Sequence, residues 1–398
     1  MTRRLVLLDF GLIDRSGHAC EYDGNVTEAF LGRGWECVVY AHRACRLPTV
    51  GRVQVRPWFH YAPTDPIVGL RPLRPIAKLL LHAVRTGAEL ERAVAAEDGP
   101  ETVFFVQHAE QYQIPPLYRA LRKRQGALVL MLRATSLRLT RGGPRPTFRT
   151  WLYRLFLPRL ARLGARLVLV TDSEHLRREY AGITAHPVHL LPLPNPPTVR
   201  KARRRNPGPL RIVSVGRASF EKGIQFLPGI MRAVRRAGVA SVFSIHAYTH
   251  PSEDPTAYEP VRAAIRAGMA EGDHLIEAAL ASEQYRRELE SADVALLLFE
   301  PNRYRHQTSG VLIDVLAAGC FPVVSKGTWL ADMVREAGYG AVVPIDGSTD
   351  VAVAAILEAG LPDTISPGVA RLLAFHSRDR FFELFTQAID AGPSAPAV

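Results

Sequence analysis

Residues 213–223 read Val213-Ser214-Val215-Gly216-Arg217-Ala218-Ser219-Phe220-Glu221-Lys222-Gly223. A short apolar run, typical of a buried β-strand, ends at Gly216, and the charged turn after it leads into a stretch that predicts a helix. Arg217 and Lys222 flank this turn, so the two cations and the first amides of the helix can converge on one anion. A diphosphate fits that arrangement. The alternative is a solvated turn whose basic residues are incidental.

A second segment of the same kind occupies residues 304–324. It reads Tyr304-Arg305-His306-Gln307-Thr308-Ser309-Gly310-Val311-Leu312-Ile313-Asp314-Val315-Leu316-Ala317-Ala318-Gly319-Cys320-Phe321-Pro322-Val323-Val324. Ser309 can cap a helix, and Gly310 lets the backbone approach a ligand closely. A further strand is predicted after Gly319. The segment therefore predicts a second ligand contact.

The whole chain alternates short apolar runs with longer amphipathic ones, which is the pattern of parallel α/β domains. At 398 residues it is long enough for two such domains. The proline-rich stretch 191–197 and the basic stretch 200–209 predict a linker between them. We expect a first domain over 1–195, a linker over 196–209, a second domain over 210–374, a last helix over 375–391 and a frayed tail over 392–398. Strands are predicted near residues 4–9, 36–41, 102–107, 127–132, 166–171, 210–215, 241–247, 274–276, 293–298, 321–325 and 341–343.

Both segments resemble signatures of the group 1 retaining glycosyltransferases. Residues 216–223 resemble the family's GR-x-x-x-EKG motif, and residues 310–324 resemble its glycine-led helix followed by an A-x-G-x-PVV strand. Weaker resemblances follow in the family's order at residues 169–174, around Asn195, at residues 291–298 and at residues 376–385. The resemblance implies the GT-B fold, with two Rossmann-like, doubly wound parallel-sheet domains facing across a cleft and a C-terminal helix returning to the first domain.

The same resemblance implies a nucleotide-sugar donor in the second domain and transfer of its sugar with retention. It assigns leaving-group stabilisation to Arg217 and Lys222, and it makes Asp314 the residue that holds the donor ribose, unless Asp314 is only a partly exposed helix residue. The family's other acidic residue is missing, since His306 or, with one gap, Gln307 stands in its place. No metal and no cofactor is expected, because side chains supply the cations. The donor-binding residues implied are Gly216, Glu221, Ser309, Gly310, Val311, Leu312 and Asp314.

The first domain offers candidates for the acceptor side. A glycine-containing loop with Gly11, Gly17 and His18 follows the first strand, where the family places a loop between donor and acceptor. His18 is a candidate catalytic residue there, although a lone loop histidine is often structural. His108 lies after another strand, and its pairing with Glu110 suggests zinc without supplying enough ligands. Arg133 follows the next strand and is expected either to bind an anion or to form a salt bridge.

The net charge of +12 lies entirely in the first half of the chain. Residues 1–200 hold 29 Lys and Arg against 16 Asp and Glu, and residues 111–171 hold 13 basic residues and no acidic one. A field of one sign attracts an anionic partner. The stretch Arg145–Arg166 interleaves basic residues with Phe148, Trp151 and Phe156, so it either lies on anionic lipid or covers a sheet with its apolar face. Nucleic acid is disfavoured because the aromatic spacing is helical.

Four scattered cysteines and the absence of any apolar run of about 18 residues favour a reduced, cytoplasmic protein without a transmembrane segment, peripheral at most on the inner membrane face. The sequence thus favours a hexosyl-type glycosyltransferase of cell-envelope, polysaccharide or glycolipid synthesis, acting on a sugar, glycolipid or small-molecule acceptor. Two alternatives stay open. One is a noncatalytic GT-B-like protein that binds sugar nucleotides, and the other is another GT-B enzyme such as a sugar-nucleotide epimerase.

Overall fold

The computed structural model describes residues 2–14, 18–61, 80, 82–140, 143–196, 208–249, 254, 256–345, 349–359 and 366–391. The chain divides into two compact units. Unit 1 comprises Met1–Pro196 together with Ser377–Val398, and unit 2 comprises Pro197–His376. Most of the expected linker, the expected tail and Gly17 lie outside the described residues.

Unit 1 is built on an eight-stranded sheet in the order β10-β9-β6-β5-β1-β2-β4-β3. All its strand pairs are parallel except β3 with β4. Its strands are β1 (Arg4–Leu8), β2 (Glu36–His42), β3 (Thr49–Val50), β4 (Val53–Phe59), β5 (Thr102–Val106), β6 (Ala127–Met131), β9 (Leu167–Thr171) and β10 (Val188–Leu190), with a separate hairpin of β7 (Leu137–Thr140) and β8 (Gly143–Pro146). Its helices are α1 (His18–Leu31), α3 (Gly87–Glu97), α4 (Ile114–Leu121), α5 (Phe148–Leu160), α6 (Glu174–Ala181) and α15 (Arg378–Asp390).

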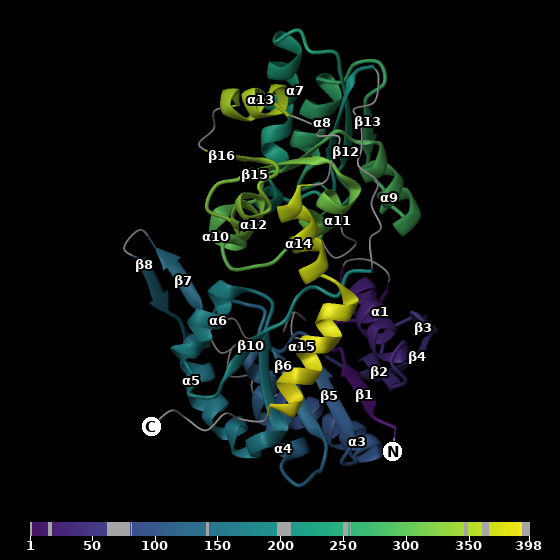
Figure 1. The fold of residues 1–398 in the computed structure, drawn as a ribbon, viewed down its shortest axis with the longest axis vertical. Helices are drawn as coiled ribbons and strands as arrows, with labels where there is room; N and C mark the ends of the chain where they lie inside the picture. Colours follow the sequence, from purple (N-terminus) through teal and green to yellow (C-terminus); the bar gives the residue numbers. More distant parts are fainter. Residues whose placement is uncertain are drawn as a thin grey trace. The chain divides into compact units, whose positions relative to one another are not determined.

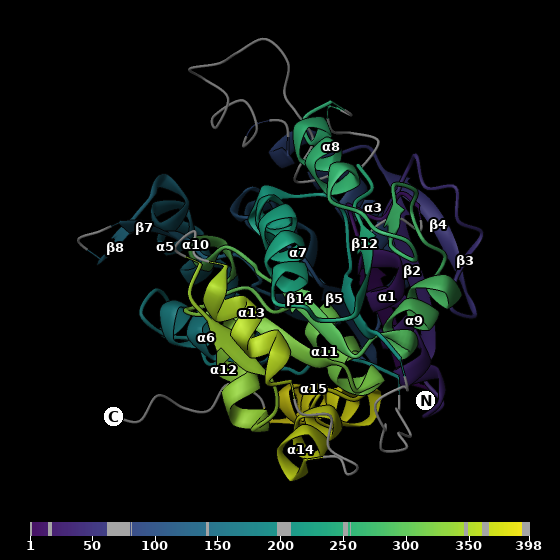
Figure 2. The ribbon, with the colours of Figure 1, turned by 90° about the horizontal axis from the view of Figure 1, so that it is seen from above.

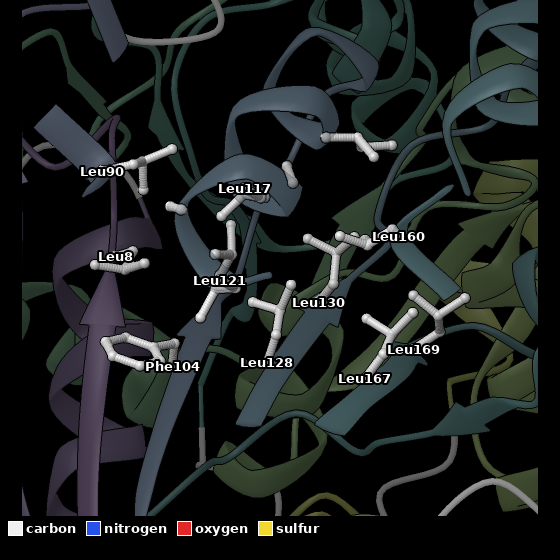
Figure 3. Packing of buried hydrophobic residues seen from close by; sticks show 14 of the residues in the cluster. Leu8, Leu90, Phe104, Leu117, Leu121, Leu128, Leu130, Leu160, Leu167 and Leu169 are labelled. Atoms are coloured by element: carbon white, nitrogen blue, oxygen red, sulfur yellow. The ribbon is translucent and has the colours of Figure 1, made fainter. Parts of the chain in front are cut away.

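The main core of unit 1 forms where alternate residues of the central strands meet α3, α4 and α5. Leu8, Phe104 and Leu128 point from three neighbouring strands toward Leu117 and Leu121 of α4 (Figure 3). The residues between them in each strand, such as Phe105, are also buried. Both faces of a parallel sheet are covered in this way, which is why its strands are apolar throughout.

The second face of this sheet is covered by α1 and by α15, which returns from the far end of the chain (Figure 1). The ring of Phe385 lies 5.0 Å from that of Phe30 in α1 and 5.2 Å from that of Phe105 in β5. Arg378 donates to the Asn25 side chain at 2.5 Å. The last helix therefore belongs to unit 1, as the family resemblance implied.

Unit 2 is built on a six-stranded parallel sheet in the order β13-β12-β11-β14-β15-β16. A core of buried residues joins this sheet to α7, α8 and α13, and Figure 2 shows α7 and α11 on opposite sides of β14. Its strands are β11 (Leu210–Ser214), β12 (Ser241–His246), β13 (His274–Ile276), β14 (Val294–Leu297), β15 (Phe321–Ser325) and β16 (Ala341–Val343). Its helices are α7 (Leu227–Arg236), α8 (Glu259–Ala267), α9 (Ser282–Ser291), α10 (Pro301–Tyr304), α11 (Gly310–Ala318), α12 (Trp329–Ala337), α13 (Asp350–Leu357) and α14 (Pro367–Phe375).

The structure differs from the sequence-based expectation in several places. The last helix begins at Arg378 rather than at residue 375, because α14 ends at Phe375 and Ser377 caps a new helix by accepting from the Arg380 amide. The hairpin β7–β8, the strands β3, β4 and β10, and the helices α10, α13 and α14 were not predicted. The charged turn was expected to lead directly into a helix, but two 3-10 turns, Phe220–Lys222 and Ile224–Phe226, come before α7, which starts at Leu227.

Candidate active site

The charged turn of residues 216–223 follows β11 at a topological switch point of the unit 2 sheet. Successive strands run from β11 toward β12 on one side, whereas β14 and β15 continue on the other. Parallel α/β sheets bind ligands at such points, outside the carboxyl ends of their strands. Arg217 and Lys222 lie close enough for the charge of one to act on the other, and burial together with Arg217 lowers the pKa of Lys222 to about 8. Two cations thus converge where a ligand site is expected.

Gly216 and Gly223 give this turn its conformation. Both have positive φ, 118° and 81° respectively, which side chains other than glycine rarely adopt. A Cβ on Gly216 would lie 3.0 Å from Nζ of Lys222, and one on Gly223 would lie 2.2 Å from the carbonyl oxygen of Leu298. The turn is therefore pressed against the chain that follows β14, and the Lys222 ammonium lies over the Gly216 backbone.

A histidine that the sequence did not single out holds the turn from the other side. The amide of Gly216 donates to Nδ1 of His246 at 3.3 Å, and Nε2 of His246 lies 2.9 Å from the carbonyl oxygen of Ala278. Burial lowers the pKa of His246, and nearby Lys222 lowers it further. The ring is thus neutral at neutral pH, with Nε2 as the donor. The available signal was position alone, since His246 is the last residue of β12.

Residues 299–303, which follow β14, contact the turn through polar and aromatic groups. Nζ of Lys222 lies 5.7 Å from the centre of the Phe299 ring. Glu221 pairs with Arg303 at 3.2 Å, and its carbonyl oxygen accepts from the amide of Glu300 at 2.8 Å. Glu221 therefore connects the turn to α10. The ammonium of Lys222 lies beside Gly216.

The predicted donor helix is α11, which starts at Gly310. A Cβ on Gly310 would meet no described atom within 4 Å, and Ser309 precedes the helix without capping it through its side chain. The amides of Gly310 and Val311 lie at the same edge of the sheet as Gly216, because α11 follows β14, the neighbour of β11. The amide of Leu312 donates to the carbonyl oxygen of Ser309 at 3.2 Å. Asp314 is half-buried, and one of its carboxylate oxygens accepts from the hydroxyl of Tyr285 at 3.1 Å.

A second polar cluster lies at the switch point of the unit 1 sheet, between β1 and β5. Asp9 follows β1 and Gln107 follows β5, and the Gln107 amide donates to Asp9 at 2.5 Å. Arg133, after β6, donates to Gln107 at 3.2 Å and to Asp172, after β9, at 2.9 Å. Its guanidinium also lies 4.1 Å from the centre of the Tyr22 ring. Arg133 thus forms a strand-end salt bridge with Asp172, and its binding of an anion stays a prediction.

Asp23 of α1 is a further member of this cluster and lies near Asp9. It is fully buried, and no described group donates a hydrogen bond to either of its carboxyl oxygens. Burial raises the pKa of Asp23 well above its ordinary value, and the neighbouring Asp9 raises it further. The raised pKa favours the neutral form of Asp23, and Asp9 accepts from Gly11 at 2.8 Å and from Gln107.

Two of the other residues predicted in unit 1 are connected to this network. The Gly11 amide donates to Asp9. The charges of Arg133 and Asp9 act on His108, whose pKa is lowered by desolvation and then by Arg133. His18 is the first residue of α1, but its side chain and all of Gly17 lie outside the described part of the chain. His108 is exposed next to Gln107. Within the described ranges, no group of three or more His, Cys, Asp or Glu is arranged to hold a metal ion, so His108 and Glu110 gain no third ligand there.

No protein-family model matches the sequence, and no curated protein sequence matches it. Solved structures match it over nearly its whole length. Sucrose-phosphate synthase from Thermosynechococcus elongatus has a TM-score of 0.68 at 13% identity, with 98% of this chain and 100% of that chain covered. HepE of Anabaena in complex with UDP has a TM-score of 0.68 at 12% identity, covering 98% and 100%. The trehalose-6-phosphate synthase OtsA has a TM-score of 0.64 at 14% identity, covering 97% and 99%.

These structural neighbours are GT-B glycosyltransferases. The similarity confirms the fold expected from the sequence, with two parallel-sheet α/β units and a last helix packed on the first. The chain therefore has the GT-B fold.

Proposed function

We propose that this protein is a retaining glycosyltransferase that moves a sugar from a nucleoside diphosphate donor to an acceptor hydroxyl. The observation that carries the proposal is the convergence of Arg217 and Lys222 at the switch point of unit 2, beside the open N-terminus of α11. Such a site presents two cations and backbone amides to one anion. The donor diphosphate is the ligand that uses all of them.

The chemistry assigned to this site is stabilisation of the leaving group. The bond between the anomeric carbon and the β-phosphate oxygen breaks, the acceptor oxygen joins the same face of that carbon, and the acceptor proton passes to the departing diphosphate. Negative charge grows on the diphosphate during this step. Cations held by the fold before the reaction begins lower its barrier, because they need no reorganisation when the charge appears.

UDP-sugars are the first donors to test. HepE of Anabaena was solved with UDP and glucose, and the E. coli trehalose-6-phosphate enzyme with UDP-2-fluoro glucose. The sugar is proposed to be a hexose and the product a cell-envelope polysaccharide or glycolipid. A panel of UDP-, GDP- and ADP-sugars should identify the donor through thermal stabilisation, since a ligand that binds only the native state raises its melting temperature.

The decisive experiment compares Arg217→Ala and Lys222→Ala with the native protein in turnover of the donor so identified. Each variant should lose at least about ten- to a hundredfold in rate, as expected when a contact to a developing anion is removed. Arg236→Ala is the matched control, because Arg236 is an exposed cation at the end of α7. Near-normal rates in both site variants would contradict the assignment. NMR of the product then tests retention through its anomeric configuration.

A noncatalytic sugar-nucleotide-binding role is the second candidate, and one observation favours it. His306 or Gln307 stands where the resembled family has an acidic residue. Tight binding of a nucleotide sugar, with no release of free nucleotide over a broad panel of acceptors, would support this role against transfer. Release of nucleotide that depends on an acceptor would exclude it.

A further inference from the structure

Two large aromatic side chains stand in solvent at the start of α5. Phe148 is 50% exposed and Trp151 is 56% exposed. Their rings stack on each other, with centres 5.7 Å apart and planes 19° apart. Phe156, which the sequence grouped with them, is buried in the core of unit 1 instead. Exposed aromatic residues that adjoin one another mark a contact surface more often than scattered ones do.

The same side of α5 continues as a row of cations. Arg154 and Arg159 are exposed, and at 100° per residue they fall on the same face of the helix as Phe148 and Trp151. No described acidic side chain forms an ion pair with either arginine. Arg149, by contrast, turns toward Glu110 and pairs with it at 3.6 Å. The face therefore carries aromatic rings at one end and uncompensated charge along the rest.

The hairpin before α5 adds a pair of like charges. Arg138 of β7 lies directly opposite Arg145 of β8, and both side chains are exposed. Like charges at directly opposed positions destabilise a hairpin, and no described acidic residue pairs with either one. Figure 1 shows β7 and β8 standing out from the body of unit 1 beside α5, and β8 contacts α5. An anionic partner would remove the repulsion between these two arginines.

We propose that the face formed by Arg138, Arg145, Phe148, Trp151, Arg154 and Arg159, here called the basic-aromatic face, binds the surface of a membrane that contains anionic lipid. Guanidinium groups bind phosphate through paired hydrogen bonds, and aromatic rings favour the headgroup level of a bilayer. A single-stranded nucleic acid would need rings free to stack on bases, whereas Phe148 and Trp151 stack on each other. The contact proposed is peripheral. None of the helices in the described ranges is long and apolar enough to cross a membrane.

The test measures binding of the full chain to vesicles of phosphatidylcholine alone and of phosphatidylcholine with about a third phosphatidylglycerol. Each arginine near an anionic surface strengthens partition by roughly fivefold at low salt. The double variant Arg138→Gln/Arg145→Gln should therefore weaken binding to the anionic vesicles about 25-fold. Binding of the native chain should fall steeply between about 50 and 300 mM salt as the Debye length shortens.

The matched control is Arg122→Gln/Lys123→Gln, which removes the same charge from exposed positions after α4. It should bind nearly as well as the native chain. Trp151→Phe should abolish the blue shift of tryptophan fluorescence on vesicle addition, because Trp35 and Trp329 are buried and Trp58 packs against Tyr40. Circular dichroism establishes that each variant is folded.

Three results would overturn the proposal. They are equal binding to neutral and anionic vesicles, an equal loss in the Arg122/Lys123 control, and tighter binding of a single-stranded oligonucleotide than of anionic vesicles at the same salt. The proposal does not depend on glycosyl transfer, because vesicle binding is measured without donor or acceptor.

Discussion

At the level of single residues, the carboxyl edges of both sheets hold ionisable groups in environments unlike water. Asp23 is buried near Asp9 in unit 1, and Lys222 lies close enough to Arg217 in unit 2 for the charge of Arg217 to act on it. In both cases burial is the largest cause of the pKa shift, and a neighbouring group of the same charge type adds to it. These two residues therefore make the pH dependence of the protein testable.

The free energy of unfolding of the native chain should fall as pH rises from 4 to 8, and we expect Asp23→Asn to make this fall smaller. The pKa of Asp23 is raised in the native state, so above about pH 4 the unfolded chain releases this proton while the native chain keeps it. The stability from this group is thus complete below the unfolded pKa and is lost as pH rises toward the native pKa, by up to about 1.4 kcal/mol per pH unit. Asparagine has nearly the shape of a protonated aspartic acid but does not titrate.

Urea unfolding of both proteins between pH 4 and 8 measures this difference. The free energy of unfolding of the variant, minus that of the native protein, should increase as pH rises. Asp390→Asn serves as control, because it makes the same substitution at an exposed position, where Asp390 pairs with Arg3. A difference between Asp23→Asn and the native chain that does not change with pH would refute the protonated state of Asp23.

Lys222 should make donor affinity depend on pH. Its pKa of about 8 in the free protein means that the ammonium is lost above pH 8, whereas a bound diphosphate would favour the charged form and raise that pKa. The affinity for the donor should therefore be highest below about pH 8 and should fall by up to tenfold per pH unit above it. Calorimetry at pH 8.5 in buffers of different ionisation enthalpy should detect proton uptake on binding. Lys222→Arg should bind without this uptake, and uptake in that variant would assign the proton elsewhere.

At the level of elements, α15 joins residues from the two ends of the chain. Phe381 and Phe385 are fully buried, and their rings lie against Phe105 of β5. Arg378 anchors the start of the helix on Asn25, and its amide donates to the carbonyl oxygen of Asn195 at 2.9 Å. The helix thus closes a face of the unit 1 sheet that would otherwise be exposed apolar surface.

Phe385→Ala should destabilise unit 1 by about 3–5 kcal/mol, the usual cost of removing a buried phenylalanine side chain. Gln387→Ala on the exposed side of the same helix should change the free energy of unfolding by no more than about 0.5 kcal/mol. Equilibrium denaturation followed by circular dichroism measures both. Similar values for the two variants would show that α15 does not form part of the core.

At the level of the whole molecule, two separate cores support two chemically different units. The core of unit 1 joins its sheet to α3, α4 and α5, and that of unit 2 joins its sheet to α7, α8 and α13. The basic excess falls in the half of the sequence that builds most of unit 1. In the proposed function, unit 2 therefore supplies specific cations to the donor, while the general positive field belongs to unit 1.

Activity should be independent of divalent metal if side chains serve the diphosphate. EDTA should leave donor turnover nearly unchanged, because Arg217, Lys222 and the amides of α11 provide the positive charge that a metal ion otherwise contributes. The measurement is turnover after dialysis against EDTA and again after magnesium or manganese is added. Loss of activity that either metal restores would count against the mechanism.

The sequence by itself determined the two α/β units, most central strands, and the turn around Gly216, Arg217 and Lys222. These features depend on apolar periodicity and on residues within about ten positions of one another. The local sequence is therefore enough to predict them. The roles of the predicted site residues, the metal independence and the membrane contact stay predictions. The β7–β8 hairpin was not predicted because the apolar alternation of β7 covers only four residues and β8, with Pro144 and Pro146, has none.

Only the tertiary structure decided which distant residues meet. Asp9, Gln107 and Asp172 are joined through Arg133 because four strands end at one edge of a sheet whose order differs from their order in the sequence. The same holds for α15, which packs on α1 from the other end of the chain. Such contacts depend on strand order and packing, which are set by the burial of whole faces rather than by local spacing.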